Sequence, residues 1–125
     1  MKDDALEMAL LLDFYGEVLT EKQFEFFDLY HNQDLSLGEI AENEGITRQG
    51  VRDVIQRATA TLRELEDKLG LIALHERLTP ALTRIGAAAD AILNANLEHF
   101  NHDVAFHAES ILKQIEALKQ YQEQD

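Results

Sequence analysis

The segment from Ser36 to Arg57, SLGEIAENEGITRQGVRDVIQR, restricts the fold more than any other part of this chain. Ser36 and Glu39 have the spacing of a capping box, in which the hydroxyl and the carboxylate each cap a backbone N–H at a helix start. Thr47 is a second candidate N-cap, and Gly45 can adopt the left-handed conformation that ends a helix. Two helices joined by so short a turn are typical of a helix-turn-helix, whose second helix usually enters the DNA major groove.

Apolar side chains on the two helices of this segment have the spacing needed to pack together. The expected contacts join Leu37, Ile40 and Ala41 of the first helix to Ile46, Val51, Val54 and Ile55 of the second. Ala41 is small at the point where the two helices must cross closely. The pattern therefore predicts that the motif has its own apolar core.

Composition and periodicity extend this prediction to an all-α fold. Hydrophobic residues make up 46% of the 125 residues, proline occurs once, and period-two alternation is nearly absent. We predict a helix-turn-helix with additional N- and C-terminal helices. Residues 1–125 are expected to form a single domain, with the helix-turn-helix core at 20–69 and a C-terminal helical extension at 71–125.

The N-terminal part predicts two further helices. The first spans Asp4 to Leu19 and is apolar on several sides, so that it needs burial on several sides. Thr20 and Gln23 form a capping box that starts the next helix, which runs to about Tyr30. Its buried residues are expected to be Phe24, Phe27 and Leu29 or Tyr30. A partner subunit would cover the first helix, so we predict a homodimer.

From Thr47 onward the sequence predicts three helices, and residues 71–125 contain no recognisable site. The helix that Thr47 opens keeps a 3.6-residue apolar rhythm until Gly70 stops it, and its length also favours a dimer contact. A second helix follows, with Pro80 in its first turn. A break near 101–103 precedes the last helix.

Charged residues are distributed unevenly along this chain. The formal net charge is −13, which argues against binding nucleic acid through bulk electrostatics. Residues 47–63 are locally basic, because Arg48, Arg52, Arg57 and Arg63 stand against Asp53 alone. This pattern has two interpretations: a narrow basic strip that touches phosphate or RNA, or ordinary solubilising residues on a long helix.

Five residues near the start of this basic helix are the candidate contacts with nucleic acid or another partner. They are Arg48, Gln49, Arg52, Gln56 and Arg57. Arginine can bind guanine or phosphate, and glutamine can bind adenine. Asp53 lies in the middle of the same face and would repel phosphate. Gly50 is unusual inside a helix, and it either permits a close backbone approach or fills a crowded position.

Other classes of protein are disfavoured by what the sequence lacks. No cysteine is present, and no catalytic motif, phosphate-binding glycine loop or cofactor site is recognisable. Three histidines and Asp103 could suggest a metal site, but a solvated face is the preferred interpretation; the histidines are His99, His102 and His107. The N-terminus resembles no signal peptide, and no apolar run could span a bilayer, so we expect a cytoplasmic protein.

Residues 11–70 resemble a known family. The similarity rests on the segment LLDFYGEVLTEKQFEFFDLYHNQDLSLGEIAENEGITRQGVRDVIQR and continues through the EDKL segment at 66–69. It resembles the YlxM family of small bacterial proteins, whose helix-turn-helix is similar to region 4 of sigma factors. The chain departs from the family pattern at Gly50, where alanine is usual, and at Arg52, where an aromatic residue is common.

The resemblance implies an all-α homodimer without catalytic activity that is linked to the signal recognition particle pathway. We therefore expect an accessory or regulatory protein that contacts the GTPase of the particle or its RNA, without any cofactor. The alternative is a dimeric transcriptional regulator that reads duplex DNA with residues 47–57. A third interpretation is a structural homodimer whose helix-turn-helix binds nothing.

Overall fold

A computed structural model describes residues 5–123 of the chain, and those residues are entirely helical apart from turns and loops. The elements are α1 (Ala5–Tyr15), the short 3-10 helix η1 (Gly16–Val18), α2 (Glu21–His31), α3 (Leu37–Glu44), α4 (Arg48–Leu69), α5 (Leu71–Ala95) and α6 (His102–Glu123). The all-α prediction is confirmed. The chain divides into two compact units, and the boundary along the sequence falls between Ile72 and Ala73. The single-domain organisation of residues 1–125 stays a prediction.

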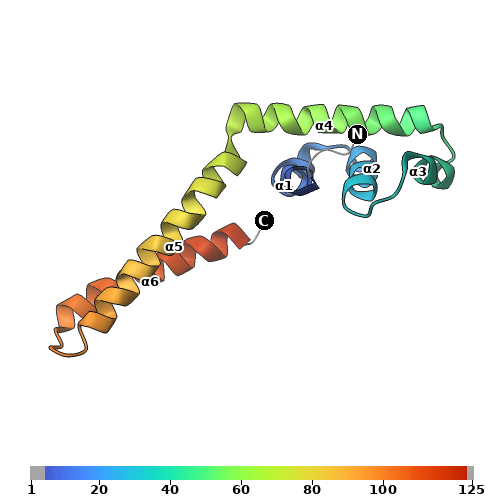
Figure 1. The fold of residues 1–125 in the computed structure, drawn as a ribbon. Coiled ribbons are helices and arrows are strands. Elements are labelled where there is room, and N and C mark those ends of the chain that lie inside the picture. The colour runs from blue at the N-terminus through green and yellow to red at the C-terminus, as the bar shows by residue number, and fades with distance from the viewer. Residues whose placement is uncertain (1–4, 124–125) are drawn as a thin grey trace. The chain divides into compact units, whose positions relative to one another are not determined.

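In the first unit, α1, α2 and α3 lie along one side of the long helix α4 (Figure 1). Two apolar clusters hold these helices together. The cluster under α1 contains Met8, Leu11, Leu12, Tyr15, Leu19, Phe27, Ala58, Leu62 and Ile72. The cluster under α3 contains Phe26, Tyr30, Ile40, Ala41, Val51 and Ile55. Because α4 contributes to both clusters, it supports the whole unit.

The predicted helix caps are confirmed. The Thr20 hydroxyl accepts from the Gln23 N–H at 3.1 Å, and the Gln23 side chain accepts from the Thr20 N–H at 3.0 Å. Ser36 and Glu39 form the same reciprocal pair, at 3.0 and 3.1 Å. Gly45 has a φ of 69°, in the left-handed region that favours glycine.

The faces of two N-terminal helices differ from the prediction. The helix expected to reach Leu19 ends at Tyr15, and one turn of 3-10 helix follows. On α2 the core residues are Phe26, Phe27 and Tyr30; the predictions of Phe27 and Tyr30 are confirmed, whereas the predicted Phe24 is 42% exposed. The Phe24 ring lies over Gly16, where an added Cβ would come within 2.9 Å of its Cε2 atom. Phe24 therefore covers the surface of the α1–η1 corner and does not enter the core.

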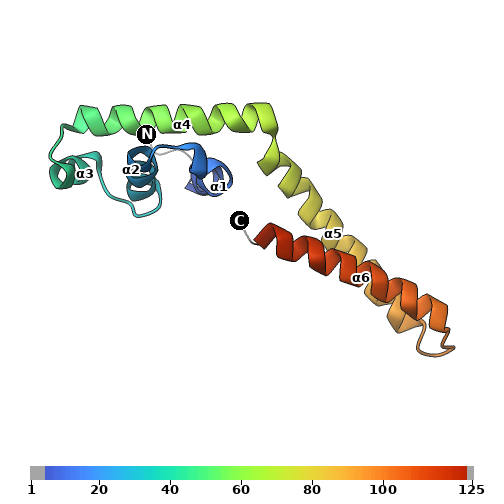
Figure 2. The ribbon, with the colours of Figure 1, turned by 180° about the vertical axis from the view of Figure 1, so that it is seen from behind.

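In the second unit, α5 and α6 form an antiparallel hairpin (Figure 2). Its loop is closed by two hydrogen bonds. The Asn96 side chain donates to the Asn101 carbonyl at 3.0 Å and accepts from the Asn101 N–H at 3.1 Å. The Asn101 side chain also accepts from the N–H groups of Asp103 and Val104. The break expected near 101–103 is confirmed, and Asn101 caps the start of α6.

The start of α5 was predicted wrongly. The helix begins at Leu71, so that Pro80 lies in its interior and not in its first turn. The first backbone N–H groups of α5 are capped from outside the helix, because Leu71 donates to the Tyr15 hydroxyl and Ile72 donates to the Glu66 carboxylate, each at 3.0 Å. Among residues 5–123, no helix has the length and apolar content that crossing a bilayer requires.

Candidate partner-binding surface of the helix-turn-helix

The α3–α4 pair has the geometry of a helix-turn-helix. Residues 45–47 form the turn, in which the Ile46 N–H donates to the Ala41 carbonyl at 3.1 Å. Ile46 itself is 41% exposed, which corrects its predicted place in the core. Ile40 of α3 and Val51 of α4 are fully buried in the shared cluster. The packing fixes α4 on one side and leaves the opposite side open to solvent.

All five predicted contact residues are exposed, but they do not form one continuous surface. Gln49, Gln56 and Arg57 lie on the side of α4 that points away from the core, and Arg52 lies on its flank. Arg48 differs, because its guanidinium lies across α3. A Cβ added at Gly38 would come within 3.0 Å of the Arg48 Nε atom. We call Gln49, Arg52, Asp53, Gln56 and Arg57 the outer face of α4.

Gln49 and Asp53 are joined on this outer face. The Gln49 side-chain amide donates to the Asp53 carboxylate at 2.9 Å. Bidentate binding of adenine needs both the oxygen and the amide of glutamine, so that the bond to Asp53 competes with it. The sequence suggested opposite effects for these two residues, whereas the structure makes them a pair.

Gly50 provides room for the helix cap. Its N–H donates to the Thr47 hydroxyl at 3.0 Å, and an added Cβ would stand only 3.2 Å from that oxygen. Of the two roles considered for Gly50, the crowded position is therefore the correct one, and the crowding comes from its own N-cap. No neighbouring helix backbone needs the space.

The basic strip is shorter than the sequence indicates. Arg63 forms an ion pair with Glu7 of α1, at 3.5 Å. This arginine therefore joins α4 to α1 within the first unit. Arg52 and Arg57 form no ion pair with any residue in the range 5–120. They are therefore the arginines of α4 that are best placed to meet a partner.

An acidic surface lies beside this strip, and the sequence reasoning did not use it. Helix α3 carries Glu39, Glu42 and Glu44, all exposed, and has no lysine or arginine. The signal was present in the sequence, in the composition of the segment LGEIAENE. In helix-turn-helix complexes with DNA, the first helix crosses the phosphate backbone, where three carboxylates would be repelled. The surface as a whole is therefore of mixed charge.

The hollows found beside this surface are open to solvent. One of about 560 Å³ lies at the start of α3 and is lined by Glu39 and Arg48, and one of about 310 Å³ lies beside α4, between α2 residues and Gln56, Thr59 and Arg63. Within residues 5–120, no three histidine, aspartate or glutamate side chains gather where one metal ion could bind them all. The arrangement offers charged and polar groups on an open surface, which suits binding to another macromolecule.

Comparison with known proteins agrees with this geometry. Residues 2–100 match the family described as "Putative helix-turn-helix protein, YlxM / p13 like". The chain belongs to this family. The membership predicted from residues 11–70 is confirmed, and α6 lies beyond the matched residues.

Relatives in this family are similar in sequence to much of this chain. A UPF0122 protein of Acetivibrio thermocellus is 60% identical over 70 residues, which are 56% of this chain and 60% of that protein. The alignment thus spans less than two thirds of the Acetivibrio protein. A UPF0122 protein of a Thermoanaerobacter species is 47% identical over 92 residues, 74% of this chain and 79% of its own length. One from Halalkalibacterium halodurans is 46% identical over 90 residues, with 72% and 83% covered.

Proposed function

We propose that this chain is a non-enzymatic regulatory protein of the signal recognition particle pathway, acting in the cytoplasm. Its helix-turn-helix binds the GTPase of the particle through α3 and the outer face of α4. The observation that carries the proposal is the mixed charge of this surface, because α4 presents the exposed Arg52 and Arg57 while the helix packed against it, α3, presents exposed glutamates. The link to the particle comes from the resemblance to the YlxM family.

Mixed charge favours a protein partner over nucleic acid. A phosphate backbone presents one sign of charge, and its binding relies on the release of counterions by several basic residues. Here α3 presents three carboxylates, and Asp53 adds a fourth to the outer face. A protein surface can offer both signs in complementary positions. The particle's RNA is therefore the weaker candidate.

The mechanism requires no chemistry by this chain. A protein that binds one conformation of a GTPase more tightly than another shifts the population toward that conformation. The size of the shift is limited by the difference between the two affinities. Regulation would then follow from binding alone.

A DNA-binding regulator is the second candidate, and one observation favours it. The N-terminal turns of α4 are open to solvent, and in helix-turn-helix proteins these turns contact base edges. Under this alternative Arg52, Gln56 and Arg57 read DNA, and the acidic α3 keeps non-specific binding weak.

Fluorescence anisotropy distinguishes the candidates. Because the chain has no cysteine, a single Q114C substitution on the exposed side of α6 accepts one dye far along the chain from the helix-turn-helix. The labelled protein is titrated with the particle's GTPase, its RNA, the assembled particle and random duplex DNA, each over a range of salt concentrations. We expect binding to the GTPase that weakens with salt less steeply than counterion release from a nucleic acid would require. Steeply salt-dependent binding to DNA or RNA alone would contradict the proposal.

Arg52→Ala combined with Arg57→Ala tests the surface itself. Each arginine that makes a charge-assisted contact is expected to contribute about 1.5–3 kcal/mol, so that affinity should fall by roughly a hundredfold or more. The matched control is Arg77→Ala with Arg84→Ala, which removes the same charge from exposed positions on α5. Equal losses in both variants would show an effect of net charge and not of this surface. Circular dichroism checks that both variants fold.

A further inference from the structure

Half-exposed apolar side chains form a row on each helix of the second unit, at intervals of seven residues. The row on α5 is Leu78, Ile85 and Ile92, and the row on α6 is Val104, Ile111 and Leu118. Each of these six side chains is between 38% and 51% exposed. A seven-residue repeat of large apolar residues is the signature of helices that pack against further helices in bundles and coiled coils.

The contact between α5 and α6 uses a different set of residues. Ala89 and Ala108 are 1% and 2% exposed, and Ile115 is 7% exposed. An added Cβ at Gly86 would stand 3.7 Å from the Ile115 Cδ1 atom, which confirms that these sides of the helices face each other. The most deeply buried side chains of the hairpin are therefore mostly small, and the six large side chains of the two rows remain half-exposed.

The two rows lie on the same side of the hairpin. In each row, two members lie four positions before and three positions after the buried alanine, at Ile85 and Ile92 on α5 and at Val104 and Ile111 on α6. At 3.6 residues per turn, each row lies about 40–60° around its helix axis from the buried alanine, in the same rotational sense when each helix is viewed from its N-terminus. The two helices run in opposite directions, so that this common sense places both rows on the same side of the hairpin.

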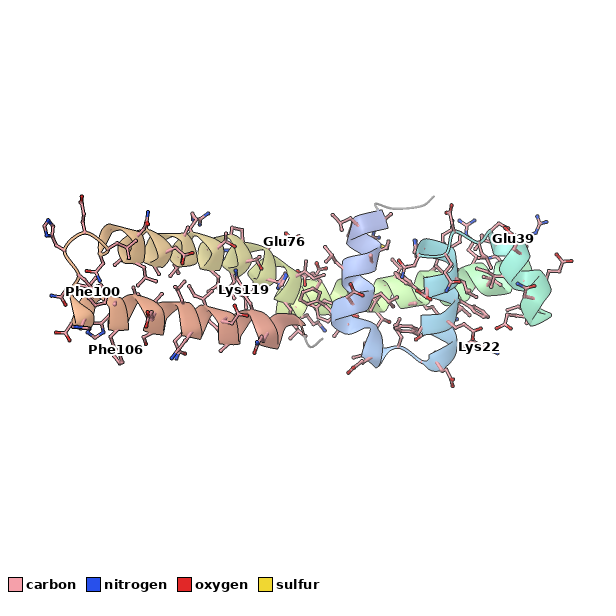
Figure 3. All side chains as sticks on the ribbon, turned by 90° about the horizontal axis from the view of Figure 1, so that it is seen from below. Lys22, Glu39, Glu76, Phe100, Phe106 and Lys119 are labelled. Carbon is pink, nitrogen blue, oxygen red and sulfur yellow. The ribbon has the colours of Figure 1, made fainter. Side chains whose placement is uncertain are left out.

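The antiparallel register also aligns the rows along the hairpin. Figure 3 shows Glu76 of α5 and Lys119 of α6 at one end of the hairpin, with Phe100 and Phe106 at the other. The hydrogen bonds between Asn96 and Asn101 fix the register at the loop. Leu78 thus lies near the level of Leu118, and Ile92 near that of Val104. We call this six-residue surface the hairpin face.

We propose that the hairpin face binds the hairpin face of a second copy of this chain, forming a four-helix bundle. The face is well suited to such pairing, because it contains no charged residue and both of its helices carry the same heptad spacing. Along its α5 edge, Ala81, Ala88 and Ala95 repeat at the same interval, and small residues beside large ones let a neighbouring helix pack closely. A two-fold symmetric pair places identical surfaces together.

The apolar area of the hairpin face is of the size that a dimer interface needs. Six large side chains that are about two-fifths exposed, with the alanines beside them, offer several hundred Å² per chain, on the order of the roughly 800 Å² per partner in a standard interface. The helices that prompted the dimer prediction, 4–19 and 47–69, bury much of their apolar surface within the first unit. The hairpin face has no such cover within the second unit.

The oligomeric state of the full chain is the first test. Light scattering coupled to size-exclusion chromatography at tens of micromolar should give twice the chain mass of 14.2 kDa. Ile85→Glu with Ile111→Glu places a carboxylate on each helix of the hairpin face and should reduce the mass to that of a monomer. The matched control is Ala87→Glu with Ala117→Glu, on the same helices but on their exposed opposite sides. It should remain a dimer.

Cross-linking tests the face without disturbing its charge. In a chain without native cysteine, I85C and I111C should each be joined between copies by a short bismaleimide, while A87C and A117C should not. A monomeric parent chain would overturn the proposal, and so would a dimer that survives both glutamates at the hairpin face. Equal cross-linking at all four positions would overturn it as well, since it would indicate random collision.

Discussion

Phe27→Ala is expected to lower the free energy of unfolding by about 3–5 kcal/mol, the usual cost of removing a buried aromatic ring. Phe27 is fully buried in the cluster that joins α1, α2 and α4. Its ring also lies 4.5 Å, centroid to centroid, from that of His31. Because domains are commonly stable by only about 5–15 kcal/mol, such a loss would leave the first unit marginally folded. Urea denaturation followed by circular dichroism measures it.

Phe24→Ala is the matched control for this prediction. It removes the same ring from the same helix, but the Phe24 side chain is 42% exposed and lies over Gly16. Its cost should stay near 1 kcal/mol, as for surface contacts that leave no enclosed cavity. If both variants lost the same stability, the face of α2 that we assign to the core would be wrong.

The parts of the fold that could be predicted from the sequence depend on residues close together in the chain. Ser36 and Glu39 are three positions apart, and each caps the other's backbone N–H. Gly45 and Gly70 end their helices through their own left-handed conformations, at φ values of 69° and 62°. Such signals are complete within one turn of chain, so that no knowledge of packing is needed to read them.

The parts that could not be predicted depend on distant residues. The amphipathic pattern of α2 is compatible with either Phe24 or Phe26 in the core, and only the position of α4 decides between them. The start of α5 was missed because its caps come from Tyr15 and Glu66, which are 56 and 6 residues away from the groups that they bind. Neither residue has a spacing that marks it as a cap.

The candidate site shows the same division. Exposure of Arg52, Gln56 and Arg57 follows from the helical period once Val51 and Ile55 are recognised as core. The helical period does not show which of the exposed arginines are free of contacts with other helices and can bind a partner. The ion pair of Arg63 with Glu7 joins two helices, and it depends on how α1 packs against α4. Local spacing gives the face of a helix, whereas tertiary packing determines which charges that face can offer.

Tyr15→Phe is expected to destabilise the first unit by about 1–3 kcal/mol, because it leaves hydrogen-bonding groups without partners. The Tyr15 hydroxyl donates to the Glu66 carboxylate and accepts from the Leu71 N–H. Phenylalanine keeps the ring in the core but removes both bonds, so the effect reports on the hydroxyl alone. Hydrogen exchange should show faster exchange of the Leu71 amide, and urea denaturation should show the loss of stability.

Glu66→Gln separates hydrogen bonding from charge at this junction. The amide oxygen of glutamine can still accept from the Tyr15 hydroxyl and the Ile72 N–H, so that the loss should be smaller than in Tyr15→Phe. Rapid exchange at Leu71 in Glu66→Gln but not in Tyr15→Phe would contradict the role that we assign to the tyrosine.

Alkaline pH should remove the contribution of the Tyr15 hydroxyl. Burial raises the pKa of Tyr15 above its ordinary value of about 10, and the hydrogen bond to Glu66 raises this pKa further. The folded state thus holds this proton more tightly than the unfolded chain. The associated stability is fully present below pH 10 and is lost as the pH rises through the folded-state pKa. The difference in unfolding free energy between the parent chain and Tyr15→Phe should therefore narrow above pH 10. A constant difference from pH 8 to 11 would mean that the pKa of Tyr15 is the same in the folded and the unfolded chain, and it would contradict the raised pKa. Absorbance at 295 nm, which follows tyrosine ionisation, checks the folded state directly.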